Sequence, residues 1–184
     1  MVVMGELLHR KCNAALPIVD VGTDVFAFLD HREEVARIQV KTATGKPYKK
    51  TKGYSADFRI PIEQLKRTDA PSLFYALAVR LSDGWSRILV ISRAELQKLR
   101  EDGVGSEIEN KKSKKFDLRL YIQFRHVSDS DEQAAEDEQK LKALCGDTDL
   151  TEYLDAWESL PPLKPPVPIE LPVDGESGSG IQAG

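Results

Sequence analysis

The chain has 184 residues, with 26 Lys and Arg against 30 Asp and Glu and a formal net charge of −4. This length predicts one compact domain with a buried core, and the apolar runs are too short to cross a bilayer, so we expect no membrane partner. The 2 cysteines are too few and too far apart to suggest a disulfide framework or a metal cluster, and we expect a cytoplasmic protein.

A first helix is expected over residues 5–15. Apolar side chains from Leu7 to Ala15 recur at helical spacing, and Pro17 ends the run. Glu6 lies in the first turn, where an acid either binds a ligand or complements the helix dipole. The sequence leaves both interpretations of Glu6 open.

An antiparallel hairpin is expected next. Residues 19–30 and 38–43 are rich in β-branched and aromatic side chains, and a polar cluster around Arg32 separates them. The pattern therefore predicts two paired strands with a turn near Arg32.

Three polar side chains of this hairpin are candidates for a site. Alternate side chains of a strand share a face, so Gln39 and Lys41 point the same way, and Asp24 comes to lie across from them. A carboxylate, an amide oxygen and an ammonium would suit a divalent cation beside a phosphate. Such side chains are also common on the solvated face of a hairpin. The apolar run that Asp24 opens, residues 25–29, favours the site, because a carboxylate there needs compensation.

Three short segments of the sequence resemble the motifs of a known family. Gly5–Leu8, Asp20–Asp24 and Ile38–Thr42 resemble the PD-(D/E)XK nuclease superfamily, in particular prokaryotic members with a GxD…QVK pattern. The resemblance covers residues 5–125. It implies an α/β, restriction-endonuclease-like mixed sheet flanked by helices, and a Mg²⁺ or Mn²⁺ cofactor.

The resemblance also implies roles for individual residues. The metal would be held by Glu6, Asp24, the Gln39 side chain and the Val40 carbonyl, and Lys41 would position or activate the attacking water. Gln39 is neutral where most members have an acid. Two functions follow: a Mg²⁺-dependent DNA endonuclease that hydrolyses phosphodiester bonds, or a catalytically weakened nucleic-acid-binding or regulatory module.

Two lysine-rich segments are candidates for contacts with DNA. Gly and Pro predict a loop over residues 42–54, where lysines lie beside tyrosines, and a second basic cluster spans residues 111–115. Either segment is equally well explained as solvated surface. The candidate nucleic-acid-binding residues are Lys46, Lys49, Lys50, Lys52, Tyr54, Ser55, Lys111, Lys112, Lys114 and Lys115.

Residues 58–124 are predicted to form several strands and one capped helix. Strands are expected over residues 58–62, 73–81 and 85–91, the last two joined by a tight Asp-Gly turn. Ser92 opens a helix as part of a capping box. Residues 116–124 alternate apolar and polar, as a strand with one buried face does. These elements predict an α/β sandwich.

The N-terminal part of the chain is basic and the C-terminal part is acidic. Residues 1–126, the expected nuclease-like domain, hold 23 Lys and Arg against 16 Asp and Glu, whereas residues 127–184 hold 3 against 14. We expect residues 127–160 to form an acidic, partly helical extension with Trp157 in an amphipathic stripe, and residues 161–184 to form a Pro-rich, largely disordered tail. The tail either binds the basic body or another protein, or is merely solvated. A homodimer would suit cleavage of both DNA strands.

Overall fold

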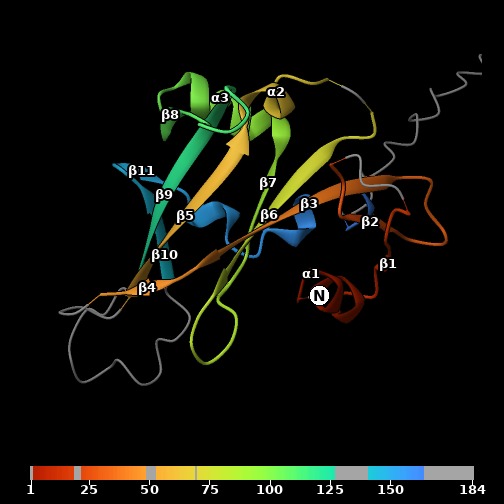
Figure 1. Cartoon of the computed structure of the whole chain (residues 1–184). Helices are drawn as coiled ribbons and strands as arrows, with labels where there is room; N and C mark the ends of the chain where they lie inside the picture. Colours follow the sequence, from red (N-terminus) through yellow and green to blue (C-terminus); the bar gives the residue numbers. More distant parts are fainter. Residues whose placement is uncertain (1, 19–21, 49–52, 69, 127–140, 164–184) are drawn as a thin grey trace, which may run out of the picture.

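The computed structural model describes residues 2–18, 22–48, 53–68, 70–126 and 141–163. These residues form an α/β body with two sheets and three α-helices (Figure 1). The first sheet has the strand order β1 (Asn13–Ala15), β2 (Val25–Phe28), β3 (Val35–Thr44), β6 (Leu73–Arg80) and β7 (Leu89–Ser92). The second has the order β11 (Thr148–Asp149), β10 (Leu141–Cys145), β9 (Phe116–His126), β5 (Gly53–Pro61) and β4 (Lys46–Pro47), and β8 (Ser106–Glu109) also pairs with β9.

The first sheet is mixed, because β3 and β6 run parallel while its other neighbours are antiparallel. The predicted hairpin is confirmed: β2 and β3 pair antiparallel, with Val25 opposite Ile38 and Phe28 opposite Val35. β6 is buried on both faces from Leu73 to the residue before Arg80, as its apolar run predicted.

Helix α1 (Val2–His9) ends earlier than the expected helix over residues 5–15. The Lys11 N–H donates to the Leu8 carbonyl and the Cys12 N–H to the Leu7 carbonyl, with Lys11 at φ 59°. This is a Schellman ending, in which a left-handed residue closes the helix and Cys12 packs back on it. The chain then pairs with β2 as β1, so the helix prediction is wrong beyond residue 9.

The two other helices follow the local signals. Helix α2 (Ile62–Leu65) directly follows β5, and α3 (Arg93–Glu101) begins at Ser92. The Ser92 hydroxyl accepts from the Glu95 N–H, and the Glu95 carboxylate accepts from the Ser92 N–H, which confirms the capping box. Gly103, at φ +85°, ends the helix.

Two apolar clusters lie on the two faces of the first sheet. One joins that sheet to the second sheet and to α2 and α3, and includes Tyr75, Phe58 and Phe124. The other packs beneath α1 and includes Ile38 and Trp157. Figure 1 accordingly shows α1 on one side of β3 and β6, with α2 and α3 on the other. The first sheet thus separates the side chains of α1 from the side chains on the face that is covered by α2 and α3.

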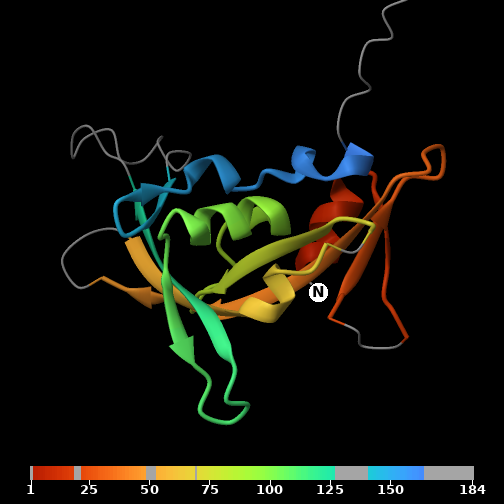
Figure 2. The same ribbon diagram turned by 90° about the horizontal axis from the view of Figure 1, so that it is seen from above.

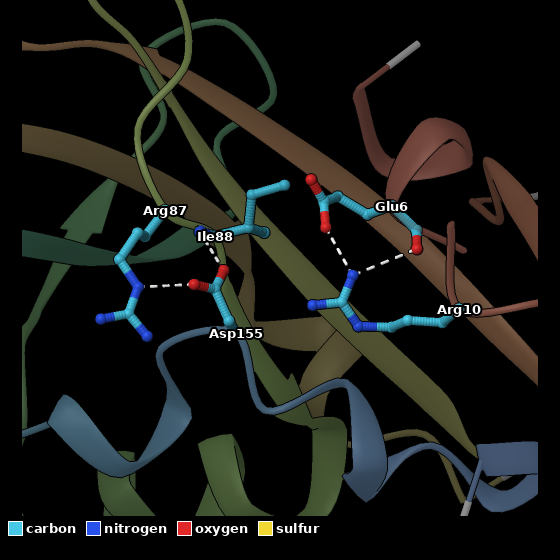
Figure 3. Close-up of polar contacts among 5 residues, drawn as sticks. All are labelled: Glu6, Arg10, Arg87, Ile88 and Asp155. Carbon is cyan, nitrogen blue, oxygen red and sulfur yellow. Dashed lines mark hydrogen bonds and ion pairs between the residues drawn. The ribbon is translucent and has the colours of Figure 1, made fainter. Parts of the chain in front are cut away.

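Residues 141–163 belong to this body, although the sequence suggested an extension that begins at residue 127. β10 pairs with β9, Leu154 bridges to Leu89, and Trp157 is fully buried. The Asp155 carboxylate accepts from Arg87 Nε at 2.5 Å and from the Ile88 N–H at 3.0 Å (Figure 3). The 3-10 helices η1 (Thr151–Tyr153), η2 (Trp157–Ser159) and η3 (Pro161–Leu163) run along one side of the body beyond α3 (Figure 2).

The bounds of several strands differ from those that the sequence predicted. The loop expected over residues 42–54 is partly strand, because β3 continues to Thr44 and β4 pairs with β5. The strand expected over residues 85–91 is confined to β7, with a single bridge from Trp85 to Arg80. The disordered tail expected from residue 161 is wrong for Pro161–Leu163, which form η3, and its residues from 164 onward lie outside the described part of the chain. No described helix is long and apolar enough to span a membrane.

Candidate functional site

Asp24 stands just before β2 and reaches across to β3. Its N–H donates to the Ile38 carbonyl at 2.9 Å, and its Oδ2 accepts from the Val40 N–H at 2.7 Å. Val40 stands between Gln39 and Lys41 in the chain, so the Asp24 carboxylate lies at the backbone between these two candidates. Its contact is with the Val40 N–H, whereas the resemblance implied a role for the Val40 carbonyl.

Gln39 and Lys41 share one face of β3. Ile38 packs in the cluster beneath α1, so strand alternation turns Gln39 and Lys41 to the opposite face, which faces α2. Gln39 is directly beside Tyr75 of β6 in the parallel ladder. The structure therefore places the Asp24 carboxylate at the β3 backbone between Gln39 and Lys41, and a shared site of the three side chains stays a prediction.

Gln39 is only 8 % exposed, and its Oε1 has no hydrogen-bond partner among the residues that the structure describes. A buried amide oxygen without a partner destabilises a fold by about 1–3 kcal/mol. Other buried side-chain atoms of the described residues share this state, among them the Tyr75 hydroxyl and Gln64 Oε1, and an ordered water or a ligand can pair such groups. Gln39 is thus the most informative member of the set.

Lys41 is half-buried, and in the part of the chain that the structure describes its ammonium makes no ion pair. Asp24 Oδ1 likewise has no hydrogen-bond donor there. One carboxylate oxygen, one amide oxygen and one ammonium therefore remain for a ligand. These are the donors and the cation that a metal-bound phosphate needs.

Glu6 is not part of this group. Its Oε2 pairs at 2.5 Å with Nη1 of Arg10, which directly follows α1, on the other face of the first sheet (Figure 3). Arg10 in turn lies over the Trp157 ring, 5.3 Å from its centroid. Among the described residues no three His, Cys, Asp or Glu side chains come together as a metal site. Asp24 is therefore the carboxylate on which a cation site here would depend.

Gln64 of α2 contacts the segment that leads to Asp24, and no signal in the sequence indicated this contact. Its Nε2 donates to the Gly22 carbonyl at 3.3 Å, two residues before Asp24, while its Oε1 is buried without a partner. Gly22 has φ +83°, and a Cβ there would lie 3.0 Å from Gln64 Nε2. No local signal links Gln64 to Asp24, because only the packing of α2 brings them close.

Tyr54 and Ser55 lie inside the body and are not exposed to a substrate. The Tyr54 ring stacks on Phe124 with 4.7 Å between centroids, and its hydroxyl hydrogen-bonds with that of Ser86. Burial raises the pKa of the Tyr54 phenol. Ser55 is also buried. Neither residue can stack on a base or contact a phosphate in this conformation.

The lysine candidates are distributed over two surfaces. Lys46 is exposed on β4, whereas Lys49, Lys50 and Lys52 lie outside the described residues. The second cluster occupies the connection between β8 and β9. There Lys115 pairs with Glu63 at 2.7 Å and Lys114 with Glu109 at 3.7 Å, while Lys111 and Lys112 are exposed. These two ion pairs reduce the charge that this cluster offers to DNA.

Two hollows lie elsewhere on the body. One of about 780 Å³ is bounded by α2, the start of β6 and the start of α3, and one of about 530 Å³ lies beside β4. Asp24, Gln39 and Lys41 line neither of them.

Comparison of the chain with protein-family models, with curated proteins and with solved structures found no match.

Proposed function

We propose that this chain is a metal-dependent endonuclease of the restriction-endonuclease-like type, which hydrolyses phosphodiester bonds in DNA with Mg²⁺ or Mn²⁺. The observation that carries the proposal is the buried Oε1 of Gln39, which has no partner among the described residues, next in the chain to Val40, whose N–H donates to the Asp24 carboxylate. The mixed sheet, with α1 on one face and α2 and α3 on the other, supports the fold that the resemblance implies.

The donor set fits a hard cation. Mg²⁺ typically takes one or two carboxylates and completes its shell with water and phosphate oxygens. Asp24 would bind through the oxygen that Val40 leaves free, and Gln39 would supply its amide oxygen. The bound ion would polarise the phosphate and lower the pKa of a coordinated water.

Lys41 would act on the same phosphate from the neighbouring position on β3. Its ammonium would orient the attacking water or stabilise the negative charge that develops as the bond breaks. The Val40 N–H fixes the Asp24 carboxylate, and Gln64 fixes the segment that leads to it. These two contacts hold the acid in position before any substrate arrives.

A second candidate, a binding or regulatory module that does not cleave, is favoured by one observation. Glu6 is engaged by Arg10, and Gln39 is neutral, so Asp24 supplies the one carboxylate that the described part of the chain brings to this site. Such a site would hold a metal weakly.

Incubation of supercoiled plasmid with Mg²⁺, Mn²⁺ or EDTA tests the proposal. We expect metal-dependent nicking that Asp24→Asn and Lys41→Ala each abolish; Asn is chosen because its amide oxygen still accepts from Val40. Matched controls are the exposed residues Asp83 and Lys98, as Asp83→Asn and Lys98→Ala, which should cleave normally. Circular dichroism confirms the fold of each variant.

Full activity in folded Asp24→Asn and Lys41→Ala proteins would show that the site is wrongly assigned. DNA binding by the wild type without any cleavage in either metal would support the binding module instead.

A further inference from the structure

The outward face of the second sheet carries an exposed tyrosine among cations. In β9 the even-numbered residues from Leu118 to Phe124 belong to the core, so the odd-numbered side chains point away from it. Tyr121 is 43 % exposed at the middle of this face. The polar residues that share the face on β5, β9 and β10 include Arg59, Arg119, Gln123, Arg125 and Lys142.

Two pairs of like charges lie directly across neighbouring strands. Arg59 of β5 is opposite Arg119 of β9, and Arg125 of β9 is opposite Lys142 of β10. Like charges in directly opposed positions destabilise a sheet. Both pairs nevertheless occur, one on each side of Tyr121 along β9.

Three carboxylates share this face with the cations, from Asp57, Asp117 and Asp149. Asp57 pairs with Arg119, with Oδ2 at 2.6 Å from Nη2, while Arg59 and Lys142 make no ion pair with any described residue. Arg125 donates to the neutral Gln123 amide. Among the described residues of this face the cations outnumber the carboxylates, so the face would attract an anionic partner.

The spacing of the two pairs suits an extended chain of phosphates. Arg119 and Arg125 are six residues apart on one strand, which is about 20 Å. Tyr121 lies between them, about 7 Å from Arg119 along the strand. An extended polyanion running along β9 would meet a cation pair, then an aromatic ring, then a second cation pair.

We propose that this face binds single-stranded nucleic acid, with the cation pairs on its phosphates and Tyr121 stacked on a base. A single strand is favoured over a duplex because only unpaired bases expose their faces to an aromatic ring. An acidic peptide would satisfy the cations but would leave the tyrosine without a role. The inference does not depend on cleavage, since Asp24, Gln39 and Lys41 belong to the other sheet.

The test is fluorescence anisotropy of a labelled oligothymidylate titrated with the full chain in EDTA, so that cleavage plays no part. Tyr121→Ala should weaken binding about 5- to 150-fold, whereas Tyr121→Phe, which keeps the ring, should bind nearly as well as wild type. The double variant Arg125→Ala with Lys142→Ala should reduce the slope of log affinity against log salt by about 1.4, for two lost phosphate contacts.

Trp85→Ala and Lys98→Ala are the controls, because they remove an exposed aromatic and an exposed cation from other surfaces. Both should bind as wild type does. The proposal is overturned if Tyr121→Ala binds like these controls, if a duplex binds as tightly as the single strand, or if polyglutamate displaces the oligonucleotide at equal charge concentration. Absence of any binding at low salt would overturn it as well.

Discussion

Replacement of Gln39 by leucine should stabilise the fold while it removes cleavage. The amide oxygen is buried without a partner, which destabilises the folded state by about 1–3 kcal/mol. Leucine has a similar size and would contact Tyr75, its fully buried neighbour on β6. We therefore expect the free energy of unfolding to rise by about 1–2 kcal/mol, since a functional polar group gives way to an apolar one.

Urea unfolding in EDTA, followed by circular dichroism, measures the change. With a denaturant slope of about 2 kcal/mol/M, the midpoint should rise by about 0.5–1 M. Plasmid nicking with Mg²⁺ is measured on the same samples and should be lost. Gln97→Leu is the matched control: Gln97 donates to Glu101 on the surface of α3, so its replacement should shift stability by less than about 0.5 kcal/mol and leave nicking unchanged.

Two results would refute this reasoning. A fall in stability of more than about 1 kcal/mol in Gln39→Leu would mean that the amide contributes to folding. Undiminished nicking by the leucine variant would mean that Gln39 takes no part in the reaction.

Four further outcomes follow from particular contacts. Glu6→Gln should leave nicking unchanged and lower stability by less than about 1 kcal/mol, because it loses only a partly exposed ion pair; a plasmid assay and urea unfolding check this. Ser92→Ala should lower the unfolding free energy by about 1 kcal/mol, because the Glu95 N–H loses its cap. Trp157→Ala should lower the unfolding free energy by about 3–5 kcal/mol, because Trp157 is fully buried in the core; urea unfolding measures this. Burial raises the pKa of the Cys12 thiol, so its thiolate fraction is low and iodoacetamide should alkylate it more slowly in the folded protein than in urea at every pH from about 7 to 9.

Local signals were sufficient for part of the fold. The β2–β3 hairpin follows from two β-branched runs around a polar turn, and α3 follows from the Ser92 capping box. The end of α1 was not predictable, because a lysine, Lys11, takes the left-handed position where a glycine would have signalled the stop. The stripe that contains Trp157 resembled an amphipathic helix, but Leu154 and Trp157 pack into different clusters from 3-10 turns.

Local sequence signals likewise predicted only part of the candidate site. Alternation along one strand places Gln39 and Lys41 on one face, and the hairpin places the Asp24 carboxylate at the Val40 N–H between them, so this local arrangement could be predicted from a short stretch of sequence. The face of the sheet on which α1 packs is decided by distant apolar contacts, and so the separation of Glu6 from Asp24 could not be read from spacing. Gln64 depends in the same way on how α2 docks.

The charges at the candidate site suggest how metal and substrate would depend on each other. Asp24 and Lys41 cancel, and Gln39 is neutral, so these three side chains offer a divalent cation no net attraction. A phosphate diester adds the missing negative charge and two oxygen ligands, so a cation would bind more favourably with nucleic acid than without it. By reciprocity the cation would strengthen nucleic-acid binding by the same factor. An unpaired Gln39 oxygen in the protein alone is consistent with a site that is completed only when both ligands are present.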